Sequence, residues 1–396
     1  MIFEKTEKYL PYSRQDISIG DIKCVLKVLR SQYITQGPVV DEFENALAKK
    51  VSSKFAIAHN SATSALHTAC LSLGLGSKDI LWTSPITFVA SANCGMYCGA
   101  SIDFVDIDFK TGLISYDSLK EKLKLAEKNG KLPKILVVVH LGGASCDMKK
   151  ISELSKKYGF AIIEDASHAL GGEYLNEPVG NCKYSNITVF SFHPVKIITS
   201  GEGGVACTND KSLAEKMRMF VSHGITKDIK RFLLSTTNSW GYEQQYLGFN
   251  YRLSDIHAAL GLSQLNRLNK IVIERNKLLK NYIKIFSNTN LKFLTIPDNV
   301  LSSVHLAILK ISNDNELLHK KIFKNLRLKK IGVQLHYNPV HLQPYYRNLG
   351  FKEGDYPNSE KYAKSYLSIP LFPGLKKKDQ LRVFNKISDE LKNKNK

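Results

Sequence analysis

A carboxylate and a lysine each follow an apolar run of the kind that forms a buried strand. Asp165 ends the run 161–165, AIIED, and Lys196 comes between the run 187–192, ITVFSF, and the glycine turn 201–204. Alone, an aspartate in this place often only caps the next helix, and one lysine among many is by default a surface residue. Because both lie at the ends of buried-looking strands, one strand-and-helix unit apart, we expect them to share a site.

The two groups match the needs of pyridoxal phosphate. A lysine forms a Schiff base with the aldehyde of this cofactor, and an aspartate paired with the pyridine nitrogen keeps that nitrogen protonated. The protonated ring can then accept electrons from a carbanion. We therefore expect Lys196 to bind the cofactor covalently and Asp165 to contact its ring nitrogen.

A phosphate site is the next requirement. The segment 59–66, HNSATSAL, runs from a strand end into a helix, and the N–H groups at a helix N-terminus bind anions with help from hydroxyl groups. An ordinary Ser/Thr helix cap would have the same sequence, so both interpretations stay open. Ser191 would add a hydroxyl before Lys196. Phe88, after the run 80–84, would either stack on a cofactor ring or belong to the core.

A sheet is needed to bring these residues together. Helical patterns alternate with short apolar runs at 55–59, 80–84, 102–107, 135–140, 161–165 and 187–192. This alternation predicts an α/β fold with a mainly parallel sheet that helices cover on both faces. Ligands of such sheets bind beyond the carboxyl ends of the strands, which is where Asp165 and Lys196 fall.

The pattern changes after about residue 255. A long helical stretch runs from 254 to about 286, two alternating apolar runs follow, and an amphipathic helix ends the chain. We predict a large cofactor-binding α/β domain over residues 1–260 and a small C-terminal α+β domain over 261–396. The long helix is expected to bridge them.

Composition excludes several classes of protein. With 396 residues, 43% of them hydrophobic, the chain can bury a full core. It has no apolar run long enough to cross a membrane, and its first residues lack the pattern of a signal peptide, so we expect a cytoplasmic protein. The seven cysteines are scattered and Cys94 and Cys98 lack partner ligands, so no metal is expected. The net charge of +20 comes mainly from lysines interleaved with acids, which favours an anionic ligand over nucleic acid.

Motifs over nearly the whole chain resemble those of the DegT-type nucleotide-sugar aminotransferases, pyridoxal-phosphate enzymes of fold type I with the aspartate aminotransferase architecture. The matching segments are QYITQGPVVDEFE (32–44), NSATSAL (60–66), PITFVAS (85–91), EDASHALGG (164–172), SFHPVKIITSGEGG (191–204), LGFNYRLSDIHAALGLSQL (247–265) and LSIPLFPGL (367–375). The resemblance gives His168 to the ring oxygen of the cofactor and Phe88 to its ring face. It also implies a homodimer with shared active sites, in which the cofactor-binding residues are Lys196, Asp165, His168, Phe88, Thr63, Ser64, Ser191 and, from the second subunit, Asn250.

Two departures from the family pattern bear on function. Many relatives have Gly-Thr where this chain has Ala62-Thr63, so the phosphate loop must do without a glycine at this point. Some relatives carry histidine in place of the Schiff-base lysine and are dehydratases. Because Lys196 is present, we expect transamination, with L-glutamate as the usual amino donor of the family.

One segment bears on the substrate. Residues 331–346, IGVQLHYNPVHLQPYY, resemble the corresponding segment in aminotransferases of pseudaminic acid biosynthesis, a pathway of flagellin glycosylation. The resemblance implies that the chain aminates C4 of a UDP-linked 4-keto-6-deoxy-N-acetylhexosamine. The residues then expected near the sugar, each of which also suits a packed or interface position, are Thr35, Gly37, His223, Arg252, Tyr337 and His341.

Three other functions stay open. A sister aminotransferase would act on another 4-keto sugar nucleotide, and the same residue types would suit an epimeric sugar. A regulatory protein would keep the fold but catalyse no reaction. The presence of Lys196, Asp165 and His168 argues against this function. A nucleic-acid-binding protein rests on the positive charge alone.

Overall fold

The computed structural model describes residues 8–234, 240–311 and 315–392. Its centre is a seven-stranded sheet in the order β1-β9-β8-β5-β4-β2-β3. The strands are β1 (Phe55–His59), β2 (Ile80–Thr83), β3 (Ser101–Phe104), β4 (Ile135–Val139), β5 (Ala161–Asp165), β8 (Ile187–Ser191) and β9 (Gly204–Thr208). Strands β3, β2, β4, β5 and β8 pair in parallel, and β9 is antiparallel to both of its neighbours. This confirms the mainly parallel sheet, although the sequence did not predict β9.

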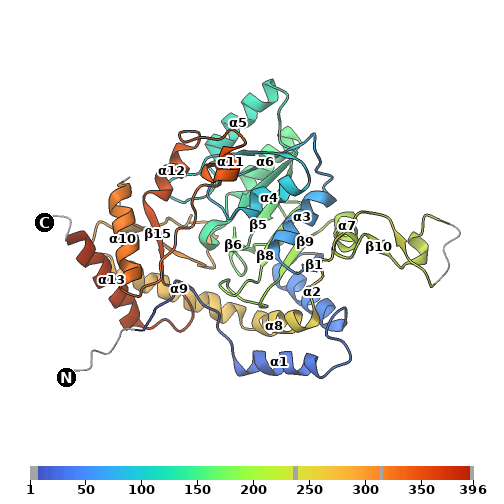
Figure 1. Ribbon diagram of the computed structural model, residues 1–396, viewed down its shortest axis with the longest axis horizontal. Helices are drawn as coiled ribbons and strands as arrows, with labels where there is room; N and C mark the ends of the chain where they lie inside the picture. The colour runs from blue at the N-terminus through green and yellow to red at the C-terminus, as the bar shows by residue number, and fades with distance from the viewer. Residues whose placement is uncertain (1–7, 235–239, 312–314, 393–396) are drawn as a thin grey trace.

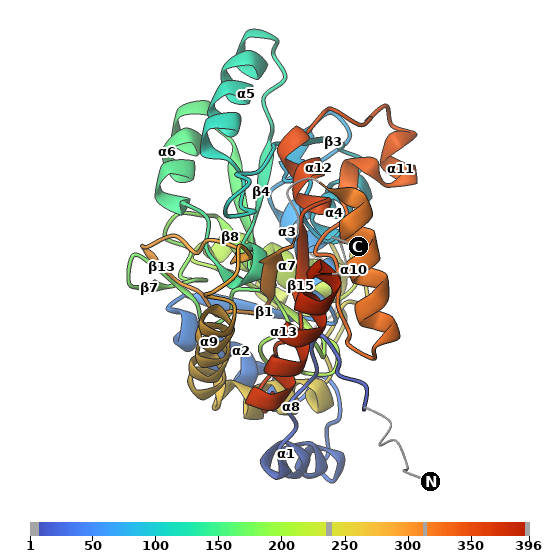
Figure 2. The ribbon, with the colours of Figure 1, turned by 90° about the vertical axis from the view of Figure 1, so that its left-hand side faces the viewer.

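Helices cover both faces of the sheet, because alternate residues of each strand face opposite sides. In β4, Ile135 and Val137 pack toward α3 (Ala62–Ser72), α4 (Ala90–Tyr97) and α7 (Lys211–Val221). Leu136 and Val138 pack toward α5 (Tyr116–Lys128) and α6 (Met148–Tyr158). Figure 2 shows α5 and α6 standing together on one side of the sheet. The continuous apolar character of β4 follows from burial on both faces.

Further helices complete the layer beneath β1 and β9. These are α2 (Pro38–Val51), α8 (Asp255–Leu265) and α9 (Leu268–Ile285), with α1 (Ile19–Leu29) lying along α8 (Figure 1). The single helix expected over 254–286 is in fact two, because Arg267 leaves helical geometry at φ −101°. Its guanidinium pairs there with Asp16 and with the buried Asp21, at 2.7 and 2.8 Å. The proposed domain boundary at 260 falls within α8 and stays a prediction.

The C-terminal part of the chain builds a separate apolar cluster. An antiparallel sheet of β12 (Lys292–Phe293), β14 (Ala307–Lys310) and β15 (Tyr366–Ile369) packs with α10 (Glu316–Leu328) and α13 (Lys377–Lys392) at one end of the molecule (Figure 1). The remaining elements are β6 (Glu173–Tyr174), β7 (Glu177–Pro178), β10 (Ile225–Thr226), β11 (Glu243–Gln244), β13 (Val300–Leu301), α11 (Pro344–Arg347), α12 (Pro357–Ala363) and three short 3-10 turns. Within the described ranges, no helix has both the length and the apolar character that a membrane crossing requires.

Candidate active site

A cavity of about 320 Å³ opens at the carboxyl ends of the central strands. Val139, Asp165 and Ser191, the last residues of β4, β5 and β8, all line it. The other walls come from the N-terminus of α3, the segment after β2, the loops after β5 and β8, Tyr12 of the N-terminal segment, and His305, Gln334, His336 and Tyr337 of the C-terminal part. The predicted site residues that line this cavity are Thr63, Phe88, Asp165, His168, Ser191, Lys196 and Tyr337.

Lys196 lies on the loop between β8 and β9, which hydrogen bonds on both sides of Lys196 hold in place. Its main-chain N–H donates to the carbonyl of His193 at 2.9 Å, and Ser13 from the N-terminal segment donates to the carbonyl of Val195 at 3.1 Å. Burial lowers the pKa of Lys196 to about 8, against the opposing influence of the Asp165 charge. A substantial fraction of this amine is therefore neutral near physiological pH, which is the form that acts as a nucleophile or base.

Asp165 is held by two donors on the cavity side of the sheet. Ser91 Oγ donates to Oδ2 at 2.6 Å, and the main-chain N–H of Ser167 donates to Oδ1 at 3.1 Å. Ser91 in turn contacts the hydroxyl of Thr87 at 2.7 Å. The sequence analysis did not single out Ser91, because Thr87 precedes α4 and only the path of the chain into that helix brings the two hydroxyls together.

At the N-terminus of α3, Ser64 serves the helix cap, whereas the residues just before it line the cavity. Ser61 Oγ accepts from the N–H of Ser64, and Ser64 Oγ accepts from the N–H of Ser61, both at 3.1 Å, so the two form a capping box. Ser64 also donates to Asn60 Oδ1 at 2.7 Å. Its buried hydroxyl is thus committed to the cap and does not line the cavity, contrary to expectation. Ser61, Ala62 and Thr63 line it instead.

The first turn of α3 rests directly on β9. A Cβ atom added to Gly204 would lie 2.4 Å from the main-chain nitrogen of Ala62. Ala62 is the first residue of α3 and has no positive φ, so this loop needs no glycine where relatives carry one.

We expect Gly204→Ala to lower the free energy of unfolding by more than about 2 kcal/mol, because backbone must shift to admit the new methyl group. Gly76→Ala is the matched control, since its Cβ would meet only Asp79 Oδ2 at 3.9 Å. Urea unfolding of the two variants measures the difference. Equal stabilities would contradict the close packing of α3 on β9.

The ring of His168 has a defined proton position. The main-chain N–H of Gly142 donates to Nδ1 at 3.3 Å, so the ring proton lies on Nε2, which is 3.1 Å from the hydroxyl of Tyr337. Burial, together with the charges of Lys196 and His336, lowers the pKa of His168 well below its ordinary value. His168 is therefore a neutral hydrogen-bond donor whose ring lies against that of His305, with centroids 4.3 Å apart and the planes tilted by 38°.

Phe88 lines the cavity and is not a core residue. Its side chain is 58% exposed, and its ring lies 6.4 Å from that of Tyr337. The geometry therefore leaves the face of Phe88 free for a planar ligand.

Several predicted residues lie outside the cavity. His341 was expected near the sugar, but it is fully buried against Phe104 and Tyr356, with Nε2 3.1 Å from Glu360, because its ring completes the apolar packing there. The others that do not line the cavity are Thr35, Gly37, His223, Asn250 and Arg252. Asn250 is exposed beside Ser222, to which Arg252 donates at 3.1 Å.

Other polar residues of the cavity received no role in the sequence analysis. They are Tyr12, Ser61, Thr87, Ser167, His193, Glu202, His305, Gln334 and His336. Gln334 and His336 belong to the segment 331–346 that was connected with the substrate, whereas no spacing in the sequence connects His305 to Lys196. Among the residues that the structure describes, no three His, Cys, Asp or Glu side chains are arranged to hold a metal ion.

These side chains fit pyridoxal phosphate. A half-buried, partly neutral lysine faces the same cavity as a carboxylate, a neutral histidine donor and an exposed phenylalanine. The N-terminus of α3 and the hydroxyls of Ser61, Thr63 and Ser191 supply donors suited to a phosphate.

Comparisons with known proteins place the whole chain among sugar-modifying enzymes. The model of the DegT/DnrJ/EryC1/StrS aminotransferase family matches residues 15–388. The UDP-4-amino-4,6-dideoxy-N-acetyl-β-L-altrosamine transaminase of Campylobacter jejuni is 38% identical over 371 residues, which cover 93% of this chain and 94% of that one.

Two solved structures share the fold over nearly their full lengths. Helicobacter pylori PseC, an aminotransferase involved in the biosynthesis of pseudoaminic acid, has a TM-score of 0.89 at 32% identity, with 98% of this chain and 100% of that chain covered. The PLP form of Spr1654 from Streptococcus pneumoniae has a TM-score of 0.87 at 27% identity, with 97% and 99% covered.

Proposed function

The chain belongs to the DegT/DnrJ/EryC1/StrS aminotransferase family and is a pyridoxal-phosphate-dependent sugar aminotransferase, and from this premise we propose its reaction. We propose that it aminates C4 of a UDP-linked 4-keto-6-deoxy-N-acetylhexosamine. The amino donor would be L-glutamate. The product would be UDP-4-amino-4,6-dideoxy-N-acetyl-β-L-altrosamine, an intermediate of cytoplasmic pseudaminic acid biosynthesis that serves flagellin glycosylation. The observation that carries the proposal is the meeting of Lys196 and Asp165 in one cavity with the polar side chains of Gln334, His336 and Tyr337.

The bound cofactor would supply an electron sink for a carbanion at the carbon that gains or loses the amine. Lys196 would hold the cofactor through Nζ until an amino substrate displaces it. The freed Nζ would then move a proton between the amino-bearing carbon and the cofactor, as a general base and later as a general acid. Its pKa of about 8 suits both tasks.

The other cavity residues would orient the cofactor. Asp165, fixed by Ser91, would face the ring nitrogen, and neutral His168 would donate from Nε2 to the ring oxygen. Phe88 would cover one ring face. The phosphate would lie against the first turn of α3, where Thr63 and Ser191 line the cavity and Ser61 takes the place expected for Ser64.

Support for the substrate comes from the relatives and from the far wall of the cavity. The Campylobacter relative is named as the UDP-4-amino-4,6-dideoxy-N-acetyl-β-L-altrosamine transaminase, and PseC is described as an aminotransferase of pseudoaminic acid biosynthesis. Gln334, His336 and Tyr337 line the cavity on the side of the C-terminal part. Amide, imidazole and phenol groups of this kind hydrogen-bond sugar hydroxyls and acetamido groups.

A homodimer would complete the site. Asn250 and Arg252 lie outside the cavity of their own chain, at the base of the projecting arm that carries β10 (Figure 1). Apolar side chains on the same arm are strongly exposed, with Trp240 at 83% and Leu247 at 81%. A second copy would cover these side chains and receive Asn250 at its phosphate site.

A panel of nucleotide-linked 4-keto sugars tests the substrate. The purified protein, loaded with cofactor and supplied with glutamate, is expected to show its highest kcat/KM with the UDP-4-keto-6-deoxy-N-acetylhexosamine of the pseudaminic acid series. A higher value with a different keto sugar would replace this substrate by that of a sister aminotransferase. Absence of turnover with every sugar and with glutamate would favour a non-catalytic role.

Cofactor attachment should depend on the protonation of Lys196. Because the neutral amine attacks the aldehyde, the rate of covalent binding is expected to rise about tenfold per pH unit below the pKa of about 8 and to level off above it. Stopped-flow absorbance of apoenzyme mixed with pyridoxal phosphate measures this rate. A rate that keeps rising to about pH 10, the range of an ordinary lysine, would contradict the lowered pKa.

A further inference from the structure

His305 is a buried histidine on the wall of the active-site cavity, and among the described residues its ring has no hydrogen-bond partner. The residue is 1% exposed, and its Nδ1 is fully enclosed. None of the other buried, unpartnered side-chain atoms in the described ranges belongs to a residue of the cavity. An unpaired buried polar group costs free energy, so its place beside the reacting groups needs a reason.

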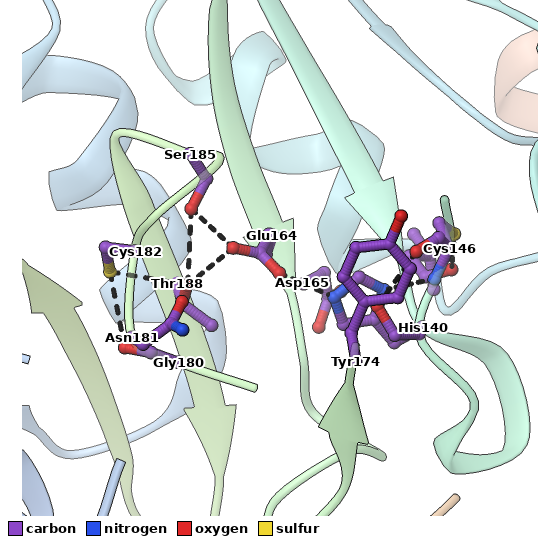
Figure 3. A network of polar contacts seen from close by, with 12 residues as sticks. His140, Cys146, Glu164, Asp165, Tyr174, Gly180, Asn181, Cys182, Ser185 and Thr188 are labelled. Carbon is purple, nitrogen blue, oxygen red and sulfur yellow. Dashed lines mark hydrogen bonds and ion pairs between the residues drawn. The ribbon is translucent and has the colours of Figure 1, made fainter. Parts of the chain in front are cut away.

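His140 shows how a buried histidine of this protein is satisfied from within (Figure 3). Its Nε2 lies 2.8 Å from Glu164, and its Nδ1 accepts from the main-chain N–H of Cys146 at 3.3 Å. Thr188 also donates to Glu164, at 2.9 Å. Both ring nitrogens of His140 are therefore used by the protein itself, whereas those of His305 are left for a ligand.

The main chain of His305 is held firmly in place. Its N–H donates to the carbonyl of Gly142 at 2.9 Å, and Arg275 Nη1 donates to its carbonyl at 3.2 Å. The residue before it, Val304, has a φ of 51°, which a β-branched residue rarely adopts. Backbone strain of this kind persists where the surroundings hold it, and it clusters at functional sites. The fixed backbone therefore sets the ring of His305 on the cavity wall.

The ring of His305 offers one N–H to the cavity. An enclosed N–H without an acceptor is rarer in proteins than an enclosed acceptor without a donor, so we place the ring proton on Nε2 and not on Nδ1. A charged ring would carry a proton on Nε2 as well, so this donor does not depend on the protonation state. A second donor lies beside it, because the ring of His168 is 4.3 Å away.

A buried positive charge lies behind His305. Arg275, on α9, is 1% exposed, and no carboxylate of the described residues forms an ion pair with it. Its Nη1 donates to the carbonyls of Val304 and His305, and the neighbouring Glu274 acts on it only at longer range. Burial lowers the pKa of Arg275 to about 10, which leaves the guanidinium charged near neutral pH. This charge favours an anion over a neutral group in front of His305.

The amino donor brings such an anion to the cavity. Lys196 is the one lysine or arginine among the described residues that line the cavity, and it holds the cofactor. The α-carboxylate of an amino acid is bonded to the carbon that loses the amine, and the ring oxygen of pyridoxal phosphate lies next to the aldehyde that receives it. If His168 faces that oxygen, as proposed above, the donor beside His168 is close to the carboxylate.

We propose that His305 is a substrate-binding residue whose Nε2 N–H donates to the α-carboxylate of the amino donor. The inference rests on the proposed function, because it uses the ring contact given to His168. Every α-amino acid has this carboxylate, so the assignment holds for donors other than glutamate. The keto sugar has no carboxylate at the carbon that gains the amine, so His305 serves the first half of the reaction more than the second.

Binding of 2-methylglutamate tests the proposal, because this amino acid has the α-carboxylate but no α-hydrogen to transfer. Absorbance titration of the cofactor-loaded protein gives its dissociation constant. We expect His305→Phe, which keeps a flat ring without a donor, to bind it at least about tenfold more weakly, as for one hydrogen bond to a charged group. His305→Gln keeps an N–H and is expected within about threefold of the wild type.

His319→Phe is the matched control. His319 is also buried, but its Nε2 lies 2.8 Å from the carbonyl of Tyr366 and it does not line the cavity. H319F should bind 2-methylglutamate as the wild type does and unfold at a lower temperature, because it leaves a carbonyl unpaired. The apoenzyme of H305F should unfold no lower than the wild type, since the nitrogens that it loses have no partner in the described protein.

Three results would overturn the proposal. The first is wild-type affinity of H305F for 2-methylglutamate. The second is a loss confined to the reaction of the amine-loaded protein with the keto sugar, because the sugar would then be the ligand. The third is a lower unfolding temperature of both H305F and His305→Leu, because packing would then explain the loss. If H305F alone fails to fold, H305L, which also lacks a donor, takes its place in the titration.

The reaction of the wild type with amino acids separates this inference from the proposed function. If the wild type transfers an amine from glutamate and H305F binds 2-methylglutamate equally well, only the role of His305 is wrong. If the cofactor-loaded wild type reacts with no α-amino acid, the proposed function itself is wrong, and the role of His305 is wrong with it.

Discussion

Lys196→Ala is expected to lower kcat for transamination by at least about 10³-fold, because the variant loses both the covalent anchor and the group that moves the proton. The position of Lys196 in the cavity wall and its lowered pKa are the observations behind this value. Binding of the cofactor should weaken far less, since the residues around its ring and phosphate remain. Steady-state rates and an absorbance titration measure the two effects separately.

Rescue by small amines distinguishes the base from the anchor. Added methylamine is expected to restore part of the proton-transfer rate of K196A, since a soluble base can enter the space left by the side chain. Lys211→Ala is the matched control, because its amine is 78% exposed and remote from the cavity. A K196A enzyme that keeps more than about a tenth of wild-type kcat would contradict the role of Lys196.

Asp165→Asn is expected to lower kcat by about 10²–10³-fold, which corresponds to the loss of one preorganised electrostatic interaction. Asparagine keeps the shape of the side chain and can still accept from Ser91 Oγ, but it lacks the negative charge that holds a proton on the ring nitrogen. The electron sink then weakens while the geometry is retained.

Ser91→Ala provides the control for that variant. It removes the hydrogen bond at 2.6 Å but leaves the charge of Asp165, so we expect a loss of only about tenfold, as for one hydrogen bond to a charged group. Comparable losses in D165N and S91A would mean that orientation, and not charge, is what Asp165 contributes. Rates measured at saturating glutamate and keto sugar decide between the two.

The sheet and the central residues of the site could be predicted from sequence because strong local patterns carry them. The apolar runs that end at Asp165 and before Lys196 became β5 and β8, whose carboxyl ends meet at one edge. The family membership expected from the motifs is confirmed over residues 15–388. Strand β9 was missed because it begins at the last glycine of the turn 201–204 and has only five residues.

Other features depend on packing that no local pattern records. Ser61 and Ser64 have the same chemistry in sequence and both take part in the capping box, but only Ser64 also donates to Asn60 and stays out of the cavity wall. His341 looked like a polar residue on a sugar-binding segment, yet Phe104 and Tyr356 enclose it. The break at Arg267 depends on Asp16 and Asp21, from the start of the chain.

Isotope transfer tests the central claim most directly. The cofactor-loaded protein is incubated with ¹⁵N-labelled L-glutamate and the UDP-4-keto-6-deoxy-N-acetylhexosamine of the pseudaminic acid series, and the nucleotide sugar is then examined by NMR. We predict a ¹⁵N amine bonded to C4 of the sugar and one 2-oxoglutarate released for each amino sugar formed. Recovery of the keto sugar unlabelled, from a protein that binds the cofactor, would contradict the account.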